Sequence, residues 1–307
     1  MSEIRTDLAV EICEELTKNK SPLPGIECTK SVRGDLTVED VVIQTPEGET
    51  LSGKPKGRYL TVGTGKVWLD DREKLKEKIY GFRDLVREMI SSQSSACRSV
   101  LIAGLGNGSI TADAVGPSAV KHLIVTRHIR KERPLIFENL GLFDVSALTP
   151  GVLGQTGIES ADVIKSVVEK IRPSLLIAID ALASRDLKRL VSTIQLCDSG
   201  IRPGSGVGNS RPGLIPEELG IPVLSIGVPT VVDAATLAAD AIRSFSGQDA
   251  RAEEIRQKWS ENALNFFVTP KETDQIINVM GAFIGYGLNL ALNEDLSFED
   301  MLSLAGG

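Results

Sequence analysis

The chain has 307 residues, a net charge of −7 and 42% hydrophobic residues, a balance typical of a globular protein large enough to bury its own core. Its acidic and basic residues are interspersed, whereas a nucleic-acid surface needs clustered Lys and Arg, so we expect no nucleic-acid partner. The polar first seven residues predict no secretory signal. None of the four cysteines forms a Cys-x-x-Cys pair, which predicts reduced thiols in a cytoplasmic protein.

The first part of the chain predicts two helices and two strands. Apolar residues recur at helical spacing over residues 8–16, and a Pro- and Gly-rich break follows. Residues 38–45 and 59–62 are predicted as strands. Residues 70–90 carry one apolar stripe, which is typical of an amphipathic helix.

From residue 98 onward, short apolar runs alternate with helical patterns. Strands are predicted at 99–103, 175–179, 191–196 and 223–227, and helices at 113–128, 161–171 and 233–244. Strands that alternate with helices favour a largely parallel sheet covered on both faces, so the expected fold is a three-layer α/β/α architecture. Its core should span about 98–245, with an N-terminal strand and helix region at 8–95 and a helical C-terminal region at 251–307.

The most apolar stretch of the chain, residues 276–292, is interrupted by Asn and Gly residues. It is too short to span a bilayer comfortably. We therefore expect a buried helix, which could lie at a subunit contact, and no membrane partner.

A glycine-rich loop within residues 104–117 joins the first buried strand to its helix. Open α/β sheets bind their ligands at such places, outside the carboxyl ends of the strands. We expect Thr111 to cap the helix, which would put Asp113 in the first turn, where backbone N–H groups favour an ionised carboxylate. Asp is also common at helix starts for structural reasons alone, so position leaves both interpretations open.

Asp180 directly follows the apolar run 175–179, and so has the same place relative to its strand as Asp113. If the two strands are neighbours, both carboxylates point into one cleft, where burial and mutual repulsion make the pair share a proton. One member can then activate a water while the other protonates the carbonyl or the leaving group. The alternative is a lone carboxylate that caps Ser184 or Arg185.

The triplet Asp198-Ser199-Gly200 resembles the catalytic triplet of pepsin-like and retroviral aspartic proteases. Those enzymes need two copies and this sequence holds one, so a turn is favoured, with Asp198 as a reserve catalytic candidate. The glycine-rich loop that follows could line a substrate groove, because glycines allow a bound chain to approach closely, or it could be an ordinary loop. The groove candidates are Gly204, Gly206 and Gly208.

Two functions that need a cofactor or a metal are weakly supported. The Gly-x-Gly-x-x-Ser spacing at residues 104–109 resembles a dinucleotide fingerprint, which would make the chain a nucleotide-binding module, but the third glycine is missing. A zinc site would usually contain histidines, and His122 and His128 fall on nearly opposite faces of one predicted helix. We therefore expect no cofactor and no metal.

Taken together, these segments resemble the germination protease family, also called spore protease. Four stretches carry the resemblance in the same order along the chain, and jointly they are specific. They are residues 5–11 (RTDLAVE), the run 104–128 that begins with GLGN and ends with TRH, residues 179–185 (IDALASR), and DSG at 198–200 with PGSGVGN at 203–209.

The resemblance implies an endopeptidase that degrades small acid-soluble spore proteins during spore germination, with a fold similar to that of hydrogenase-maturation endopeptidases. The family is regarded as unusual aspartic proteases, and its two essential aspartates match Asp113 and Asp180. The resemblance also implies a self-processing zymogen, a homotetramer and a location in the cytoplasm of the spore core or forespore. Ala112 replaces the family's commoner Pro and Val115 its Leu, changes that are conservative for the chemistry.

The N-terminal stretch suggests where self-processing occurs. Family members cut their substrates before a short apolar-Ala-x-Glu segment, and residues 7–11 (DLAVE) look like that recognition sequence. The hypothesis is that Asp7–Leu8 is the self-processing bond, so that residues 1–7 form a pro-segment and 8–307 a single α/β peptidase domain. Leu8 also fits the first turn of an amphipathic helix, and both interpretations can hold.

The expected mechanism has Asp113 and Asp180 share a proton across a water, with Asp113 as the base and the more desolvated Asp180 as the proton donor. An alternative on the same fold is a metal-dependent peptidase or a nickel-sensing maturation protease that uses the same carboxylates as ligands. The scarcity of histidine counts against that alternative.

Overall fold

The computed structural model describes residues 6–18, 23–93, 97–202, 212–246, 254, 258 and 266–305. The strands are β1 Ile26–Arg33, β2 Leu36–Ile43, β3 Gly57–Gly63, β4 Ser99–Gly104, β5 Asp144–Leu148, β6 Leu175–Ser184, β7 Thr193–Cys197, β8 Val223–Asp233 and β9 Phe267–Val268. The α-helices are α1 Ala9–Lys18, α2 Pro46–Ser52, α3 Arg72–Gln93, α4 Val115–Val120, α5 Arg127–Glu132, α6 Pro134–Asn139, α7 Leu153–Thr156, α8 Ser160–Ile171, α9 Pro216–Leu219, α10 Ala234–Ser246, α12 Thr273–Leu292 and α13 Phe298–Ala305. Short 3₁₀ turns are η1 Val67–Leu69, η2 Thr111–Asp113 and η3 Leu187–Arg189.

A single sheet connects these strands in the order β1-β2-β3-β7-β8-β6-β4-β5, with β9 paired to β8. The strands β5, β4, β6 and β8 are mutually parallel. From β8 the sheet continues through β7, β3, β2 and β1 with antiparallel pairing. The expected parallel core is therefore confirmed, and an antiparallel N-terminal extension widens the same sheet.

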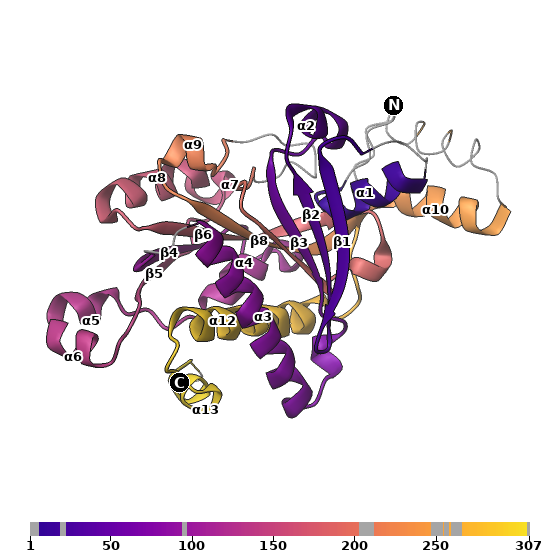
Figure 1. The fold of residues 1–307 in the computed structure, drawn as a ribbon. Helices are drawn as coiled ribbons and strands as arrows, with labels where there is room; N and C mark the ends of the chain where they lie inside the picture. The colour runs from indigo at the N-terminus through magenta and orange to yellow at the C-terminus, as the bar shows by residue number, and fades with distance from the viewer. Residues whose placement is uncertain are drawn as a thin grey trace.

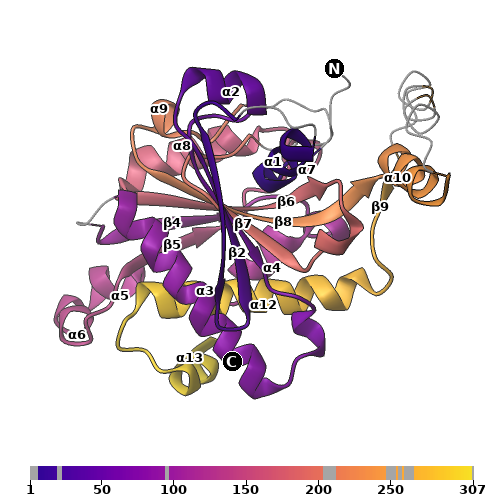
Figure 2. The same cartoon turned by 45° about the vertical axis from the view of Figure 1, so that its right-hand side comes forward.

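Helices cover both faces of the sheet, as Figures 1 and 2 show, with α3 and α12 below it and α1 and α8 above. Because strand side chains alternate between the two faces, each strand contributes to both. One continuous core fills the face under α3, α4 and α12. The other face has two separate cores, one under α8 and one under α1. The three-layer α/β/α architecture is confirmed.

The predicted helix at 276–292 is confirmed as α12. By length and hydropathy it is the one helix among the described residues that could cross a membrane, but 72% of its most apolar window is buried. It packs against α3 and α4 beneath the sheet. The apolar side chains of α12 therefore form part of the protein core.

The predicted helix at 113–128 is wrong in its extent. The chain forms the turn η2 and the short helix α4, which ends at Val120. Beyond it, Thr126 joins β5 instead: its N–H donates to the carbonyl of Val145 at 3.0 Å, and its hydroxyl accepts the Val145 N–H at 2.9 Å. Pairing with a strand therefore overrides the helical pattern in residues 121–126.

Glycine allows α4 to lie directly on the sheet. A Cβ at Gly116 would overlap the carbonyl oxygens of Leu105 and Ile179, which belong to the chain after β4 and to β6. A Cβ at Gly104 would in turn overlap the backbone of Gly116. This close approach fixes the position of η2, which immediately precedes α4.

Replacing Gly116 with Ala should push α4 away from the sheet. Such overpacking costs about 1–3 kcal/mol, so we expect the free energy of unfolding in urea to fall by that amount. The matched control is Gly154→Ala on α7, where a Cβ meets nothing within 4 Å, and a change within about 0.5 kcal/mol is expected. Equal losses in the two variants would contradict the close packing.

Candidate active site

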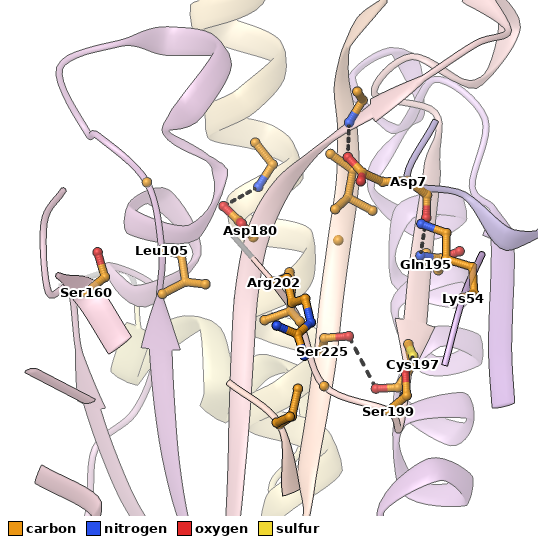
Figure 3. Close-up of a pocket in the computed structure, with 18 of the residues that line it drawn as sticks. Asp7, Lys54, Leu105, Ser160, Asp180, Gln195, Cys197, Ser199, Arg202 and Ser225 are labelled. Carbon is orange, nitrogen blue, oxygen red and sulfur yellow. Dashed lines mark hydrogen bonds between the residues drawn. The ribbon is translucent and has the colours of Figure 1, made fainter. Parts of the chain in front are cut away.

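A cavity of about 1020 Å³ lies on the upper face of the sheet, between the cores under α8 and α1. Its floor is made by residues that point to this face and belong to neither core, including Asp180, Gln195 and Ser225. Figure 3 shows Leu105 and Ser160 on one side of the floor and Cys197 and Ser199 on the other. The cavity therefore gathers a few polar side chains within a lining that is otherwise mostly apolar.

Asp180 lies within β6 and not at its end, so that part of the prediction is wrong. The pairing of β6 with β4 stops at Ile179, whereas its pairing with β8 continues to Ser184. Asp180 is thus the first residue of β6 beyond the last residue of β4, Gly104. Its residue surface is 6% exposed, and its Oδ1 accepts the N–H of Ala181 at 2.9 Å.

Asp113 is the last residue of the 3₁₀ turn η2 and lies just before α4, whereas the sequence predicts it within the first turn of that α-helix. Thr111 does not cap α4 either, because the N-cap position of that helix is Ala114; the Thr111 hydroxyl donates to Asp274. The Asp113 Oδ2 instead accepts the N–H of Asn107 at 2.7 Å. The loop can wrap this closely because residue 106 is glycine: its φ is +101°, and a Cβ there would overlap the Asp113 carbonyl oxygen.

The structure places both predicted aspartates on the same cavity. Burial, and then the nearby charge of Asp113, raise the pKa of Asp180 to about 8, although the Ala181 N–H lowers it. The charge of Asp7 adds a smaller upward contribution. Asp180 therefore carries a proton at neutral pH and can donate it.

The N-terminal segment enters this cavity at Asp7. The Asp7 N–H donates to the carbonyl of Ala183 at 2.9 Å, and its Oδ2 accepts the Ala183 N–H at 2.8 Å. The Asp7 carbonyl oxygen accepts a hydrogen bond from Gln195 Nε2 at 3.2 Å. Leu8 follows, fully buried in the core under α1. The Asp7–Leu8 bond thus lies between the cavity and a core.

Glu11 anchors the other end of the same segment. Its carboxylate accepts the backbone N–H groups of Arg185 at 2.8 Å and Asp186 at 3.0 Å, just beyond β6. Burial raises the pKa of this carboxyl, although those hydrogen bonds and that from Thr6 lower it. The DLAVE stretch is therefore held along β6 at both ends.

Gln195 is a site residue that the sequence interpretation missed. It lies in the apolar run 191–196, whose pattern predicts a strand and no functional residue. A polar side chain in a buried strand needs hydrogen-bond partners, and this requirement was the available signal.

The other sequence candidates lie elsewhere. The Asp198 Oδ1 accepts the backbone N–H of Arg58, at the start of β3, at 2.7 Å. Burial raises the pKa of the Asp198 carboxyl. Its neighbours Ser199 and Gly200 line the cavity. The glycines Gly204, Gly206 and Gly208 fall outside the described residues.

No group of three or more His, Cys, Asp or Glu side chains in the described parts of the chain is placed to hold an ion. His122 packs edge-on against Tyr286 of α12, and His128 lies on the exposed helix α5.

Comparison with known sequences shows what this chain is related to. The sequence model of the germination protease family matches residues 4–258. Germination proteases from Caldanaerobacter subterraneus subsp. tengcongensis and Clostridium perfringens are each 40% identical over 98% of both chains. The chain belongs to the germination protease family. The relative from Bacillus subtilis is 38% identical to this protease over 97% of its chain and 95% of the relative.

Family membership makes the chain a peptidase, as the sequence predicted. Among solved structures, the [NiFe] hydrogenase maturation protease HycI from Thermococcus kodakarensis is 17% identical to this protease. The match covers 58% of the protease and 99% of HycI, with a TM-score of 0.31.

The raised pKa of Asp180 predicts how Asp180→Asn changes stability with pH. In the unfolded chain this carboxyl titrates near pH 4, so between about pH 4 and pH 8 the folded protease holds a proton that the unfolded chain has lost. The stability contributed by Asp180 therefore falls as pH rises through that window. Asn cannot titrate, so the variant should match the parent near pH 4 and exceed it by roughly 2 kcal/mol or more near pH 8.

Urea unfolding of both proteins across this range measures the difference. A difference that stays constant from pH 4 to pH 8 would contradict the raised pKa.

Proposed function

We propose that this protease is an aspartic-type endopeptidase that initiates the degradation of small acid-soluble spore proteins during spore germination. The observation that carries the proposal is the pair formed by the protonated Asp180 and Asp113 on a single cavity, into which a segment like the family's recognition sequence enters. Membership of the germination protease family supports the biological setting.

In the proposed mechanism, a water lies between the two carboxyl groups. Asp113 takes a proton from this water, whose oxygen then bonds to the carbonyl carbon of the peptide. Asp180 gives its proton to the leaving nitrogen as the C–N bond breaks. The products are a carboxyl end and an amine end, and the two aspartates exchange protonation states, which solvent resets.

The proposal includes self-processing at Asp7–Leu8. Asp7 already occupies the cavity, and its two hydrogen bonds to Ala183 hold the segment against β6. While Asp7 remains there, it takes space that a substrate would need, and for this reason the proposal makes the uncut chain a zymogen. A homotetramer and a location in the spore core belong to the proposal because the family resemblance implies them.

Substituting either aspartate should stop peptide cleavage. A positioned acid or base contributes about 10²–10⁴-fold, so Asp113→Asn and Asp180→Asn should each lower kcat/KM by at least 100-fold on a peptide that copies residues 2–12. The matched control is Asp198→Asn, which also changes a partly buried carboxyl of raised pKa but should keep most of the activity.

Near-parental activity in either Asp113→Asn or Asp180→Asn would contradict the carboxylate pair. Loss of activity in a chelator, restored by added metal, would instead favour the alternative in which the carboxylates bind a metal.

Self-processing predicts a specific change of mass. After acidification, the intact protein should lose the mass of its first seven residues, as measured by mass spectrometry. Leu8→Asp should prevent this, because it places a charge where a fully buried side chain now packs, whereas Leu8→Met keeps a similar apolar volume and should be processed. Unchanged processing of Leu8→Asp would rule out Asp7–Leu8 as the bond.

A further inference from the structure

A side-chain amide holds the backbone on both sides of the Asp7–Leu8 bond. Gln195 Nε2 donates to the Asp7 carbonyl oxygen at 3.2 Å, and Gln195 Oε1 accepts the Ala9 N–H at 2.9 Å. Figure 3 shows the Gln195 side chain directed at Asp7 from β7. The carbonyl that accepts this hydrogen bond belongs to the bond proposed to be cut.

The surroundings of Gln195 fix its orientation. Its residue surface is 7% exposed, and its strand is paired on both sides, opposite Thr61 of β3 and Gly227 of β8. Because the Ala9 N–H is a donor, it must meet the amide oxygen, and this places the NH₂ group toward Asp7. The donor is thus oriented before any reaction begins.

We propose that Gln195 is a further catalytic residue, which binds the carbonyl oxygen of the scissile peptide through Nε2 and stabilises the negative charge that develops there. This inference rests on the proposed function and adds a third group to the two aspartates. The two carboxyls move protons, and the amide acts on the carbonyl oxygen.

The hydrogen bond from Gln195 affects the rate because negative charge develops on the carbonyl oxygen during the reaction. When the water oxygen bonds to the carbonyl carbon, the C=O π electrons move to the carbonyl oxygen, which becomes an oxyanion. The Gln195 N–H binds that oxyanion more strongly than the neutral carbonyl, so it lowers the barrier. When the C–N bond breaks, the carbonyl re-forms and the amide is unchanged.

The hydrogen bond from the Ala9 N–H to Gln195 Oε1 should remain after self-processing. Leu8, Ala9 and Val10 are buried against the sheet, at 0%, 2% and 5% exposure. Cutting before Leu8 therefore leaves the Ala9 N–H in place on Gln195 Oε1. Departure of Asp7 frees Nε2, which remains directed into the cavity and can receive the carbonyl oxygen of a substrate.

The test compares Gln195→Leu with the parent on the peptide that copies residues 2–12. Removal of one such donor costs about 10²–10³-fold in kcat, so we expect a loss in that range with KM changed less than about threefold. The matched control is Gln93→Leu, whose amide contacts Val223 at the far end of β8 at 3.5 Å, and its kcat should be unchanged. A kcat for Gln195→Leu within threefold of the parent would overturn the proposal.

A second variant keeps the test informative if Gln195→Leu folds poorly. Gln195→Glu retains an acceptor for the Ala9 N–H, but its carboxylate cannot donate to the carbonyl oxygen. Protonation restores an O–H donor, so kcat of Gln195→Glu relative to the parent should rise at least tenfold as pH falls from 9 to 5. A ratio that does not depend on pH would contradict a donor role, because a purely structural role would not produce this dependence.

Asp180→Asn, assayed in parallel, distinguishes failure of the proposed function from failure of the role of Gln195 alone. A parent protein that leaves the peptide intact, or an Asp180→Asn variant as active as the parent, contradicts the proposed function itself. An active parent with inactive Asp180→Asn and fully active Gln195→Leu overturns only the role of Gln195.

Discussion

Burial of the Asp180 carboxyl on an apolar sheet is the interaction on which the rest of the site depends. A carboxylate in that position loses most of its hydration, and the charge of Asp113 opposes its ionisation further, so the neutral acid is favoured. The sheet makes this possible because β4 stops one residue short of Asp180 while β8 continues beside it. Asp180 therefore faces the cavity, although burial leaves only 6% of its residue surface exposed.

The partner carboxyl is positioned by backbone geometry. Gly116 lets α4 lie on the sheet, and Gly106 lets the preceding loop close around Asp113. The Asn107 N–H then fixes one oxygen of that carboxylate. Two residues far apart in the sequence thus face one cavity, with the acid buried in a strand and the other carboxyl held by a loop. Gln195 of β7 lines the same cavity and adds a side-chain amide to the two carboxyls.

Much of this architecture was predictable from the sequence because it depends on local patterns. The apolar runs before Gly104 and Asp180 predict buried parallel strands, and the spacing in residues 276–292 predicts a buried helix. What failed depends on contacts distant in sequence. The helix expected beyond Val120 is replaced by pairing of Thr126 with β5, and β6 passes Asp180 because β8 supplies hydrogen bonds to Ser184. The role of Gln195 needs the N-terminal segment in place, which no local pattern contains.

A titration of the Asp180 carboxyl by ¹³C NMR, with Asp180→Asn used to assign its signal, tests whether this buried group holds its proton at neutral pH. We expect a midpoint near pH 8, and a lower midpoint in Asp113→Asn, where the like charge is removed. A carboxyl signal from Asp180 that titrates near pH 4 in the folded protein, and does not respond to Asp113→Asn, would show that Asp180 is ionised at neutral pH and cannot be the proton donor.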